Sequence, residues 1–355
     1  MPMRGLTLDG VETITFRDDL PDPRLEADTD AIVAVRRAGL CGSDLHPYLG
    51  RESVRFGVIP GHEVVGEVTE IGGVVSRFSV GRRVIVPFTT SCGECDPCRS
   101  GLSARCVRGD LFGYGDPEDP SKPALQGGQA ELLRVPLAEG TLVAVPEGIS
   151  DEAALLLSDN FPTGWHAARR AAVRPGRAVA VVGLGSVGLS AVAAAKTMGA
   201  DPVLAVDPVE DRRNRAERLG ARAAHPRDAE SVADLMTESG FVSVIEAAGA
   251  LSAQGLAFRL LRPGGTLSTI AVQTADRFAF TPVDVYDRNA TIRAGRAPVR
   301  SVLDRLLPLV VAGRVKMPTD VIVTHPAVPI EQGPDTYRRF AAREPGLVKV
   351  SFSFS

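Results

Sequence analysis

The stretch AVAVVGLGSVGLSAVAAAKTMGA, from Ala178 to Ala200, decides the fold expected for the second part of this 355-residue chain. An apolar, strand-like run leads directly into GLGSVG, and an alanine-rich helical run follows. Gly183, Gly185 and Gly188 permit a tight turn, close approach of the backbone to a pyrophosphate, and close packing of the helix. The stretch therefore predicts a strand, a phosphate-binding turn and a helix rather than a membrane span, since glycines divide its apolar run.

An acidic residue follows at the place where dinucleotide-binding folds use one. Asp207 ends the strand-like PVLAVD, 24 residues after Gly183, and an acid there hydrogen-bonds the ribose hydroxyls and repels a 2′-phosphate. We therefore predict NAD in preference to NADP. Arg212 and Arg213 lie nearby in the charged run EDRRNRAER. They are either a solvated helix face or, for Arg212 in particular, an adenosine-side contact.

Strand-like and helical runs alternate from Ala178 to the strand-like ATIRAG at Ala290–Gly295, which predicts a doubly wound parallel sheet. The first 148 residues instead consist of short strand-like runs and turns, which indicates a β-rich domain. Ser150 is a plausible N-cap for the helix that begins DEAALLLSD. The predicted domains are a β-rich domain of residues 1–148 and 296–355, and a dinucleotide-binding domain of residues 149–295. The tail is expected to supply one helix and the strand-like segments VIVTHP and LVKVSFSF.

The composition indicates a globular protein without a nucleic-acid or membrane surface. Apolar residues make up 44% of the chain, charged residues 23%, and the formal net charge is −3. The N-terminal stretch lacks the uninterrupted apolar run of a secretory signal, so we expect a cytoplasmic protein.

Four of the five cysteines form a cluster within CGECDPCRSGLSARC. Four thiolates at this spacing can close a tetrahedral site, which is typical of a structural zinc. A pair of disulfides is disfavoured by the expected reducing compartment, and few basic or aromatic residues are present to contact nucleic acid. The predicted ligands are Cys92, Cys95, Cys98 and Cys106.

The order of four motifs is more specific than any of them alone. GLCGSDLH with Cys41, PGHEVVGEV with His62 and Glu63, the four-cysteine loop and GLGSVG follow one another along the chain. This ordered set resembles the zinc-dependent alcohol dehydrogenases of the medium-chain dehydrogenase/reductase family, over nearly the whole chain. The resemblance implies a GroES-like catalytic domain beside a Rossmann domain, with Cys41 and His62 as zinc ligands and Glu63 as a nearby carboxylate.

The third ligand of this catalytic zinc departs from the best-known family members. The segment that usually supplies a second cysteine is LLLSDNFPTGWHA here, and it offers Asp159 instead. A carboxylate oxygen is an acceptable zinc ligand. The same substitution, together with GGQAELLRVP upstream, is similar to the branch containing glutathione-independent formaldehyde dehydrogenases.

The resemblance also implies roles for residues around the zinc. Ser43 and His46 match a proton relay from the substrate alcohol to solvent, although His46 could instead be a surface histidine. Asp44 matches the acid that holds a ligand histidine in one tautomer. Phe88 and Phe112 are candidate pocket walls, with core packing an equal alternative for Phe112.

Further residues match cofactor contacts of the family. Thr163 corresponds to a residue that packs on the nicotinamide, Ala271 and Val272 to a strand end that hydrogen-bonds its carboxamide, and Lys349 to a basic contact with the pyrophosphate. The glycine-rich loop contributes Gly183, Gly185, Ser186, Val187 and Gly188.

The function implied is interconversion of an alcohol and an aldehyde or ketone by hydride transfer with NAD, with two zinc ions per chain. The alternatives are a zinc-free enone reductase on the same fold and a non-catalytic protein that binds NAD or zinc. Cys41, His62 and Asp159 together disfavour the first, and the relay of Ser43 and His46 disfavours the second. The expected partners are a small-molecule substrate and a second or further copies of the chain, as a homodimer or homotetramer.

Overall fold

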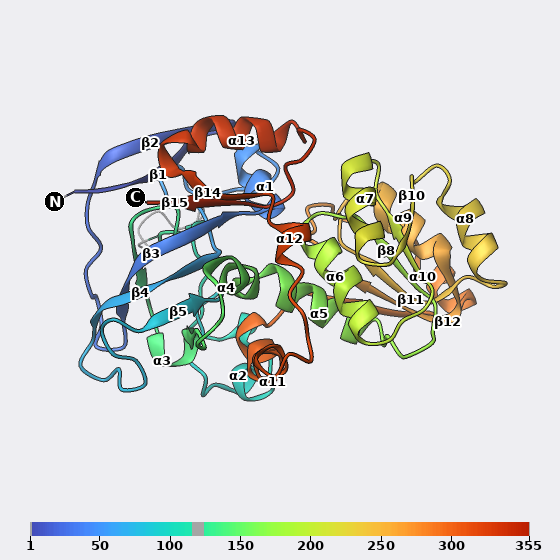
Figure 1. The fold of residues 1–355 in the computed structure, drawn as a ribbon, viewed down its shortest axis with the longest axis horizontal. Helices are drawn as coiled ribbons and strands as arrows, with labels where there is room; N and C mark the ends of the chain where they lie inside the picture. The colour runs from blue at the N-terminus through green and yellow to red at the C-terminus, as the bar shows by residue number, and fades with distance from the viewer. Residues whose placement is uncertain (1, 116–123, 355) are drawn as a thin grey trace. The chain divides into compact units, whose positions relative to one another are not determined.

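The computed structural model describes residues 2–115 and 124–354, which form two compact units (Figure 1). The first unit contains the described residues up to Asp159, together with Pro298–Thr319 and the tail from Val323. The second unit contains Asn160–Ala297 and Asp320–Ile322.

A mostly antiparallel sheet forms the centre of the first unit. Its strand order is β14-β15-β3-β4-β5-β7, with β6 paired to β3, and only the β14–β15 pair is parallel. A separate antiparallel pair is formed by β1 and β2. The strands are β1 (Met3–Gly10), β2 (Thr13–Leu20), β3 (Ala31–Leu40), β4 (Val64–Ile71), β5 (Arg83–Val86), β6 (Leu132–Val135), β7 (Val143–Ala144), β14 (His325–Pro329) and β15 (Val350–Ser353).

Helices, most of them short, connect these strands. They are η1 (Gly42–Asp44), α1 (Leu45–Tyr48), α2 (Asp96–Arg99), η2 (Ser103–Arg105), α3 (Ala138–Thr141), α4 (Asp151–Ser158), α11 (Val299–Val311), η3 (Ile330–Gln332) and α13 (Gly333–Ala341). A further helix, α12 (Thr319–Ile322), starts in this unit at Thr319, but its residues Asp320–Ile322 belong to the second unit.

The alternation of side chains along the strands produces the core of this sheet. Val33 of β3, Val68 of β4 and Val84 of β5 are fully buried in one apolar cluster, as residues on one face of a strand are expected to be. Phe112 belongs to the same cluster and is 1% exposed. Of its two possible roles, the structure therefore assigns Phe112 to core packing.

The second unit is built on a six-stranded parallel sheet of order β10-β9-β8-β11-β12-β13. Numbered in chain order from β8, this is the 3-2-1-4-5-6 order of the doubly wound dinucleotide-binding fold. The predicted fold class, a β-rich domain with a doubly wound parallel-sheet domain, is thereby confirmed. The strands are β8 (Val179–Val182), β9 (Val203–Val206), β10 (Arg222–Ala224), β11 (Phe241–Glu246), β12 (Leu261–Thr269) and β13 (Thr291–Ala294).

Helices cover both faces of this sheet, with α6 and α7 on one side and α9 on the other (Figure 1). Right-handed crossovers on either side of the first strand place them there. The helices are α5 (Asn160–Arg170), α6 (Ser186–Thr197), α7 (Glu210–Arg218), α8 (Ala229–Met236), α9 (Leu251–Leu260) and α10 (Pro282–Asp287).

Three details differ from the expectation for the segments that flank the second unit. The tail supplies three helices, α11, α12 and α13, where one was expected. Ser150 caps α4 by accepting a hydrogen bond from the Ala153 N–H at 3.2 Å, as predicted, but α4 packs on β3, β4 and β5 of the first unit rather than on the parallel sheet. The segment VIVTHP is only partly a strand, because Val321 and Ile322 lie in α12. Pro318 and the acidic Asp320 supply a helix start that overrides the β propensity of these residues.

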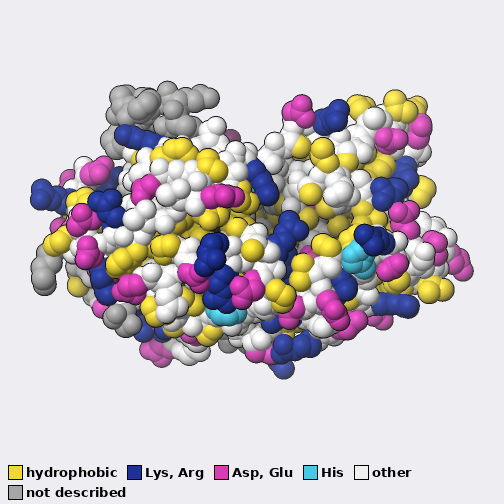
Figure 2. Space-filling model, turned by 90° about the horizontal axis from the view of Figure 1, so that it is seen from above, with side chains coloured by type: hydrophobic (Ala, Val, Ile, Leu, Met, Phe, Trp, Pro, Cys, Tyr) yellow, Lys and Arg dark blue, Asp and Glu magenta, His cyan; other side chains and the backbone are white. Residues whose placement is uncertain are grey.

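The stretch AVAVVGLGSVGLSAVAAA is predicted to form a strand, a turn and a helix rather than a membrane span. It is divided between β8 and α6 in this way. Among the described residues, no helix combines the length and apolar character needed to cross a membrane. Acidic and basic side chains are interspersed on the face shown in Figure 2.

Candidate metal centres and dinucleotide site

Four buried side chains from three parts of the first unit meet at one point. Cys41 directly follows β3, His62 and Glu63 directly precede β4, and Asp159 directly follows α4. Strands β3 and β4 are antiparallel, with Ala38 opposite Val64, so the end of one lies beside the start of the other. One potential ligand atom from each of the four residues lies within 4.8 Å of the others.

The donor set and its spacing fit a tetrahedral zinc ion. Cys41 Sγ lies 3.8 Å from Asp159 Oδ2, and His62 Nε2 lies 3.9 Å from the same oxygen. Ligand bonds of about 2.0–2.3 Å at tetrahedral angles place neighbouring donor atoms about 3.3–3.8 Å apart. Cys41, His62 and Asp159 are therefore grouped as ligands that could hold a metal ion.

The electrostatics of the cluster favour a cation. Burial, followed by the negative charge of Glu63, raises the pKa of the Cys41 thiol. For His62, burial alone lowers the pKa, but the charge of Asp44 and other neighbours raise it well above its usual value. Asp44 Oδ1 lies 3.1 Å from His62 Nδ1, a close contact that is not aligned as a regular hydrogen bond. This contact leaves Nε2 of His62 facing the cluster, as the proposed role of Asp44 requires.

Lys349 lies beside this cluster. Its side chain is fully buried beside β3, where Nζ donates hydrogen bonds to Glu63 Oε2 and to the Leu40 carbonyl oxygen, the latter at 3.2 Å. The pairing of β15 with β3, Val350 opposite Leu40, brings it there. The partners of the Lys349 ammonium in this structure are Glu63 and the Leu40 carbonyl oxygen. They differ from the predicted partner, a pyrophosphate.

Ser43, in η1, borders the cluster, whereas His46, in α1, lies farther along the same turn. Ser43 Oγ is 3.2 Å from His62 Nε2. His46 is partly buried, its Nδ1 has no hydrogen-bond partner among the described residues, and burial followed by Arg51 lowers its pKa. In the described chain the two side chains do not bond each other directly, so a relay between them needs an intervening group.

Two aromatic rings flank His62. The Phe88 ring is 6.2 Å away in an edge-on arrangement, which keeps Phe88 a candidate pocket wall. The Tyr114 ring is 6.5 Å away, and its hydroxyl donates a hydrogen bond to the Ser43 carbonyl oxygen at 3.2 Å. Sequence reasoning missed Tyr114, because no motif surrounds it.

The four clustered cysteines form a second potential metal centre. Their sulfur atoms all lie within 4.8 Å of one another, with Cys92 to Cys98 at 4.0 Å and Cys95 to Cys106 at 3.8 Å. Tetrahedral zinc with bonds of about 2.3 Å places sulfur atoms about 3.8 Å apart, and none of the cysteines is in a disulfide. Although burial acts against it, a hydrogen bond from Arg108 and backbone N–H groups lower the pKa of Cys92 to about 6, whereas burial raises the pKa of Cys98 to about 12.

The glycine-rich loop has the backbone geometry that the sequence predicts. Gly183 has a φ of +92° and follows β8 directly, and Gly185 is the N-cap of α6, whose first residues are Ser186 and Val187. A Cβ atom on Gly188 would lie 1.8 Å from the Gly183 carbonyl oxygen. Only glycine therefore allows α6 to start this close to β8.

Asp207 supports this loop with both carboxylate oxygens. Oδ2 accepts a hydrogen bond from the Leu184 N–H and Oδ1 from the Val209 N–H, both at 2.8 Å. Arg212 Nη1 lies 3.9 Å from Oδ2, whereas the Arg213 guanidinium donates to the backbone carbonyl oxygens of Asp207 and Pro208. Neither arginine is simply a solvated helix-face residue.

The remaining predicted cofactor residues also lie in the second unit. Val182 is paired with Glu246, and Glu246 with Thr269, so the ends of β8, β11 and β12 are in line. Ala271 and Val272 follow β12 and therefore lie at the same edge of the sheet as Gly183. Thr163 is buried in α5, which packs on α6 and β12.

Sequence reasoning missed Glu246 at this edge. Its carboxylate accepts hydrogen bonds from the Ala248 N–H at 2.8 Å and the Gly249 N–H at 2.6 Å, and thereby shapes the loop after β11. A buried acid that ends a strand is the signal that could have identified it.

Comparison with known proteins agrees with this architecture. Residues 27–147 match the family model of the alcohol dehydrogenase GroES-like domain, and residues 186–311 match that of the zinc-binding dehydrogenases. The chain is 38% identical over 342 residues to a probable zinc-binding alcohol dehydrogenase of Mycobacterium tuberculosis, covering 96% of this chain and 86% of the relative. A zinc-type alcohol dehydrogenase B of Aspergillus flavus is 36% identical, with 94% and 78% covered. The solved alcohol dehydrogenase TADH from Thermus sp. ATN1 has a TM-score of 0.89 and 35% identity over 99% of both chains.

The chain therefore belongs to the zinc-type medium-chain alcohol dehydrogenase family. Its first unit is the GroES-like domain and its second the Rossmann-like, nucleotide-binding domain of this oxidoreductase family, whose members act on small molecules.

Proposed function

We propose that this protein interconverts a small alcohol and its aldehyde or ketone by hydride transfer, with NAD preferred over NADP and with two zinc ions per chain. The observation that carries the proposal is the buried convergence of Cys41, His62 and Asp159 next to the hydroxyl of Ser43. A packed core does not require a thiol, an imidazole and a carboxylate at one point, because each is costly to bury without a partner. The four-cysteine loop holds the second zinc.

The reaction divides into a proton transfer and a hydride transfer. Cys41, His62 and Asp159 would hold the zinc ion, which when bound would supply Lewis-acid polarisation of the substrate oxygen. Ser43 Oγ accepts the proton of the alcohol hydroxyl as it gives up its own, and that proton reaches His46, and then solvent, through an intervening group. The carbinol carbon gives its hydride to the nicotinamide, which leaves a carbonyl compound and NADH.

Asp207 supports the preference for NAD. It is 4% exposed and is held by two backbone N–H groups, so its charge is fixed at the end of β9. A fixed negative charge there repels a 2′-phosphate more strongly than it affects a 2′-hydroxyl.

The replacement of a cysteine ligand by Asp159 favours the branch of the family that contains glutathione-independent formaldehyde dehydrogenases. Short-chain alcohols and aldehydes are therefore the first substrates to test. The proposed location is the cytoplasm, where the clustered thiols stay reduced, and the proposed assembly is a homodimer or homotetramer, as expected for the family.

The test combines metal analysis with a substrate screen. Wild-type protein should contain two zinc ions per chain and should change absorbance at 340 nm with NAD and at least one short alcohol or aldehyde. Asp159→Ala should lose one zinc ion and turnover together, whereas Asp159→Cys, which restores a zinc ligand, should keep the metal. Full activity and full zinc content in Asp159→Ala would show that Asp159 is not a ligand.

Two other results would identify the alternative functions. Turnover of an enone without zinc would support a zinc-free reductase on this fold. Binding of NADH without turnover of any substrate would support a non-catalytic protein.

A further inference from the structure

A cavity of about 260 Å³ lies in the second unit, at the edge of the parallel sheet opposite the glycine-rich loop. Arg177 precedes β8 by two residues, and Val242 and Ser243 lie at the start of β11. Ser243 is paired with Val179 on one side and with Thr266, another lining residue, on the other. The cavity therefore lies where the strands begin. The lining residues are Ala172, Arg174, Arg177, Val242, Ser243, Arg262 and Thr266.

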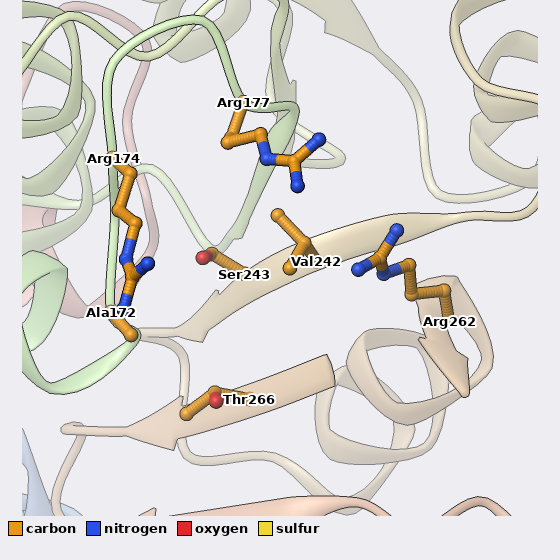
Figure 3. A pocket seen from close by; sticks show the side chains of 7 residues that line it. All are labelled: Ala172, Arg174, Arg177, Val242, Ser243, Arg262 and Thr266. Atoms are coloured by element: carbon orange, nitrogen blue, oxygen red, sulfur yellow. The ribbon is translucent and has the colours of Figure 1, made fainter. Parts of the chain in front are cut away.

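Three positive charges surround this cavity without a negative charge to balance them. Arg174, Arg177 and Arg262 come from the α5–β8 connection and from the start of β12, and Figure 3 shows them on different sides of Ser243. No acidic residue lines the cavity. Within residues 2–115 and 124–354, none of the three guanidinium groups takes part in an ion pair. Like charges held this close repel one another unless an anion joins them.

Two buried polar atoms at the cavity also lack a partner. Ser243 is fully buried, and neither its Oγ nor Arg262 Nε has a hydrogen-bond partner among the described residues. An unsatisfied buried polar group costs about 1–3 kcal/mol, and native folds rarely leave two beside one another. Both groups can donate a hydrogen bond, as can the other two arginines.

A site made of donors and positive charge selects a ligand with several acceptor oxygens and negative charge. Phosphoryl and carboxylate groups have this character, and the planar guanidinium binds them through paired hydrogen bonds. A single carboxylate neutralises only one of the three arginine charges. A phosphate dianion neutralises two of them and leaves hydrogen-bond donors for a second polar group. We propose that this cavity binds the phosphoryl group of a small phosphorylated compound.

This site is separate from the one predicted for the cofactor phosphates. The glycine-rich loop follows the far end of β8, and four strand residues at about 3.3 Å each place the two edges about 13 Å apart. The proposal does not depend on the proposed dehydrogenase function.

The test is calorimetric titration of zinc-loaded protein saturated with NADH, so that the cofactor site cannot take the added phosphate. Inorganic phosphate and glycerol 3-phosphate serve as separate probes at constant ionic strength. Saturable binding of at least one of them at one site per chain is expected, and tighter binding of the ester than of free phosphate would identify an organic phosphate as the ligand. Equal or tighter binding of free phosphate would identify the inorganic ion.

Variants locate the binding. Arg262→Gln and Arg177→Gln should each weaken binding at least fivefold, and Ser243→Ala should weaken it about twofold to fivefold. Arg222→Gln removes an equal charge from the same edge of the sheet, at the start of β10 and outside the cavity, and should leave the affinity unchanged.

A second readout keeps the proposal testable if a variant folds poorly. Without phosphate, Arg262→Gln should melt at the same temperature as wild type or higher, because it relieves repulsion. Phosphate should then raise the melting temperature of wild type but not of the variant. The absence of saturable binding in wild type, or an equal loss in Arg222→Gln, would overturn the proposal.

Discussion

Lys349 and Glu63 form an ion pair in which both side chains are fully buried. The residues are 286 positions apart in the sequence, and the pairing of β15 with β3 brings them together. Glu63 also has a potential ligand atom within 4.8 Å of those of Cys41, His62 and Asp159. The ammonium of Lys349 therefore holds a carboxylate that borders the proposed catalytic metal site.

Replacing Lys349 with Met leaves the Glu63 carboxylate buried without its counter-charge. We expect a loss of about 3–5 kcal/mol in the free energy of unfolding, because a buried charge without its partner is costly. Urea unfolding of the zinc-loaded protein measures this. The double variant Lys349→Met with Glu63→Gln should recover a large part of the loss. A single variant as stable as wild type would contradict the burial of a charged pair.

Replacing Cys95 with Ser should remove one of the two proposed zinc ions and loosen the loop from Cys92 to Cys106. A tetrahedral site with three thiolates binds zinc more weakly, and the loop has little other structure than α2 and η2. Limited proteolysis should cut this loop faster, and the melting temperature should fall. Cys95→Ser should keep part of its activity, in contrast to Cys41→Ser. A loop that still resists proteolysis after the variant has lost its metal would argue against a structural role of the four-cysteine site.

The fold could be predicted because its signals are local. The sequence GLGSVG between a strand and a helix, and the alternation that follows, reflect backbone requirements at Gly183 and Gly188 that the structure shows directly. The four-cysteine loop could be predicted for the same reason, since its four cysteines are close in sequence. The helix α12 was missed because a helix start at Pro318 competes with the β-branched residues that follow.

The parts of the site that could not be predicted depend on contacts between distant segments. Cys41, His62 and Asp159 were identified through a family pattern, but the partner of Lys349 follows from strand pairing that no local motif encodes. The hydrogen bond from Tyr114 to the Ser43 carbonyl oxygen spans 71 residues in the same way. Two arginines of the cavity come from the α5–β8 connection and the third from the start of β12, and each alone has the sequence context of an ordinary surface residue.

Replacing Asp207 with Ser should shift cofactor use towards NADP. The substitution removes the negative charge and leaves Arg212, now 3.9 Å from that carboxylate, free to contact a 2′-phosphate. The ratio of kcat/KM for NADP to that for NAD should rise at least tenfold. Asp207→Asn removes the same charge but keeps the size of the side chain. It is therefore the control for the loop contacts that Asp207→Ser loses. A clear NADP preference in wild type would contradict the assigned role of Asp207.

Replacing His46 with Gln should change the pH dependence of alcohol oxidation. Burial and Arg51 lower the pKa of His46, so the wild-type histidine stays neutral, and able to accept a proton, to a pH below its ordinary value of about 6.5. The variant should lose at least about tenfold in kcat/KM near neutral pH, with less loss at high pH, where hydroxide accepts the proton. A profile from pH 5 to 10 that is parallel to that of wild type would instead indicate a structural histidine.

Replacing His166 with Gln should make stability less sensitive to acid. Burial, followed by the charges of Arg170 and Arg169, lowers the pKa of His166 to about 4, whereas the unfolded chain has a value of about 6.5. The unfolded state therefore binds more protons between these two values, so the stability due to neutral His166 is complete above pH 6.5 and is lost as the pH falls towards 4. Allowing for partial solvent screening, the loss is about 1–3 kcal/mol. Urea unfolding at pH 7.5 and 5 should show a smaller decrease for His166→Gln than for wild type, and equal decreases would mean that His166 accepts its proton in the folded protein.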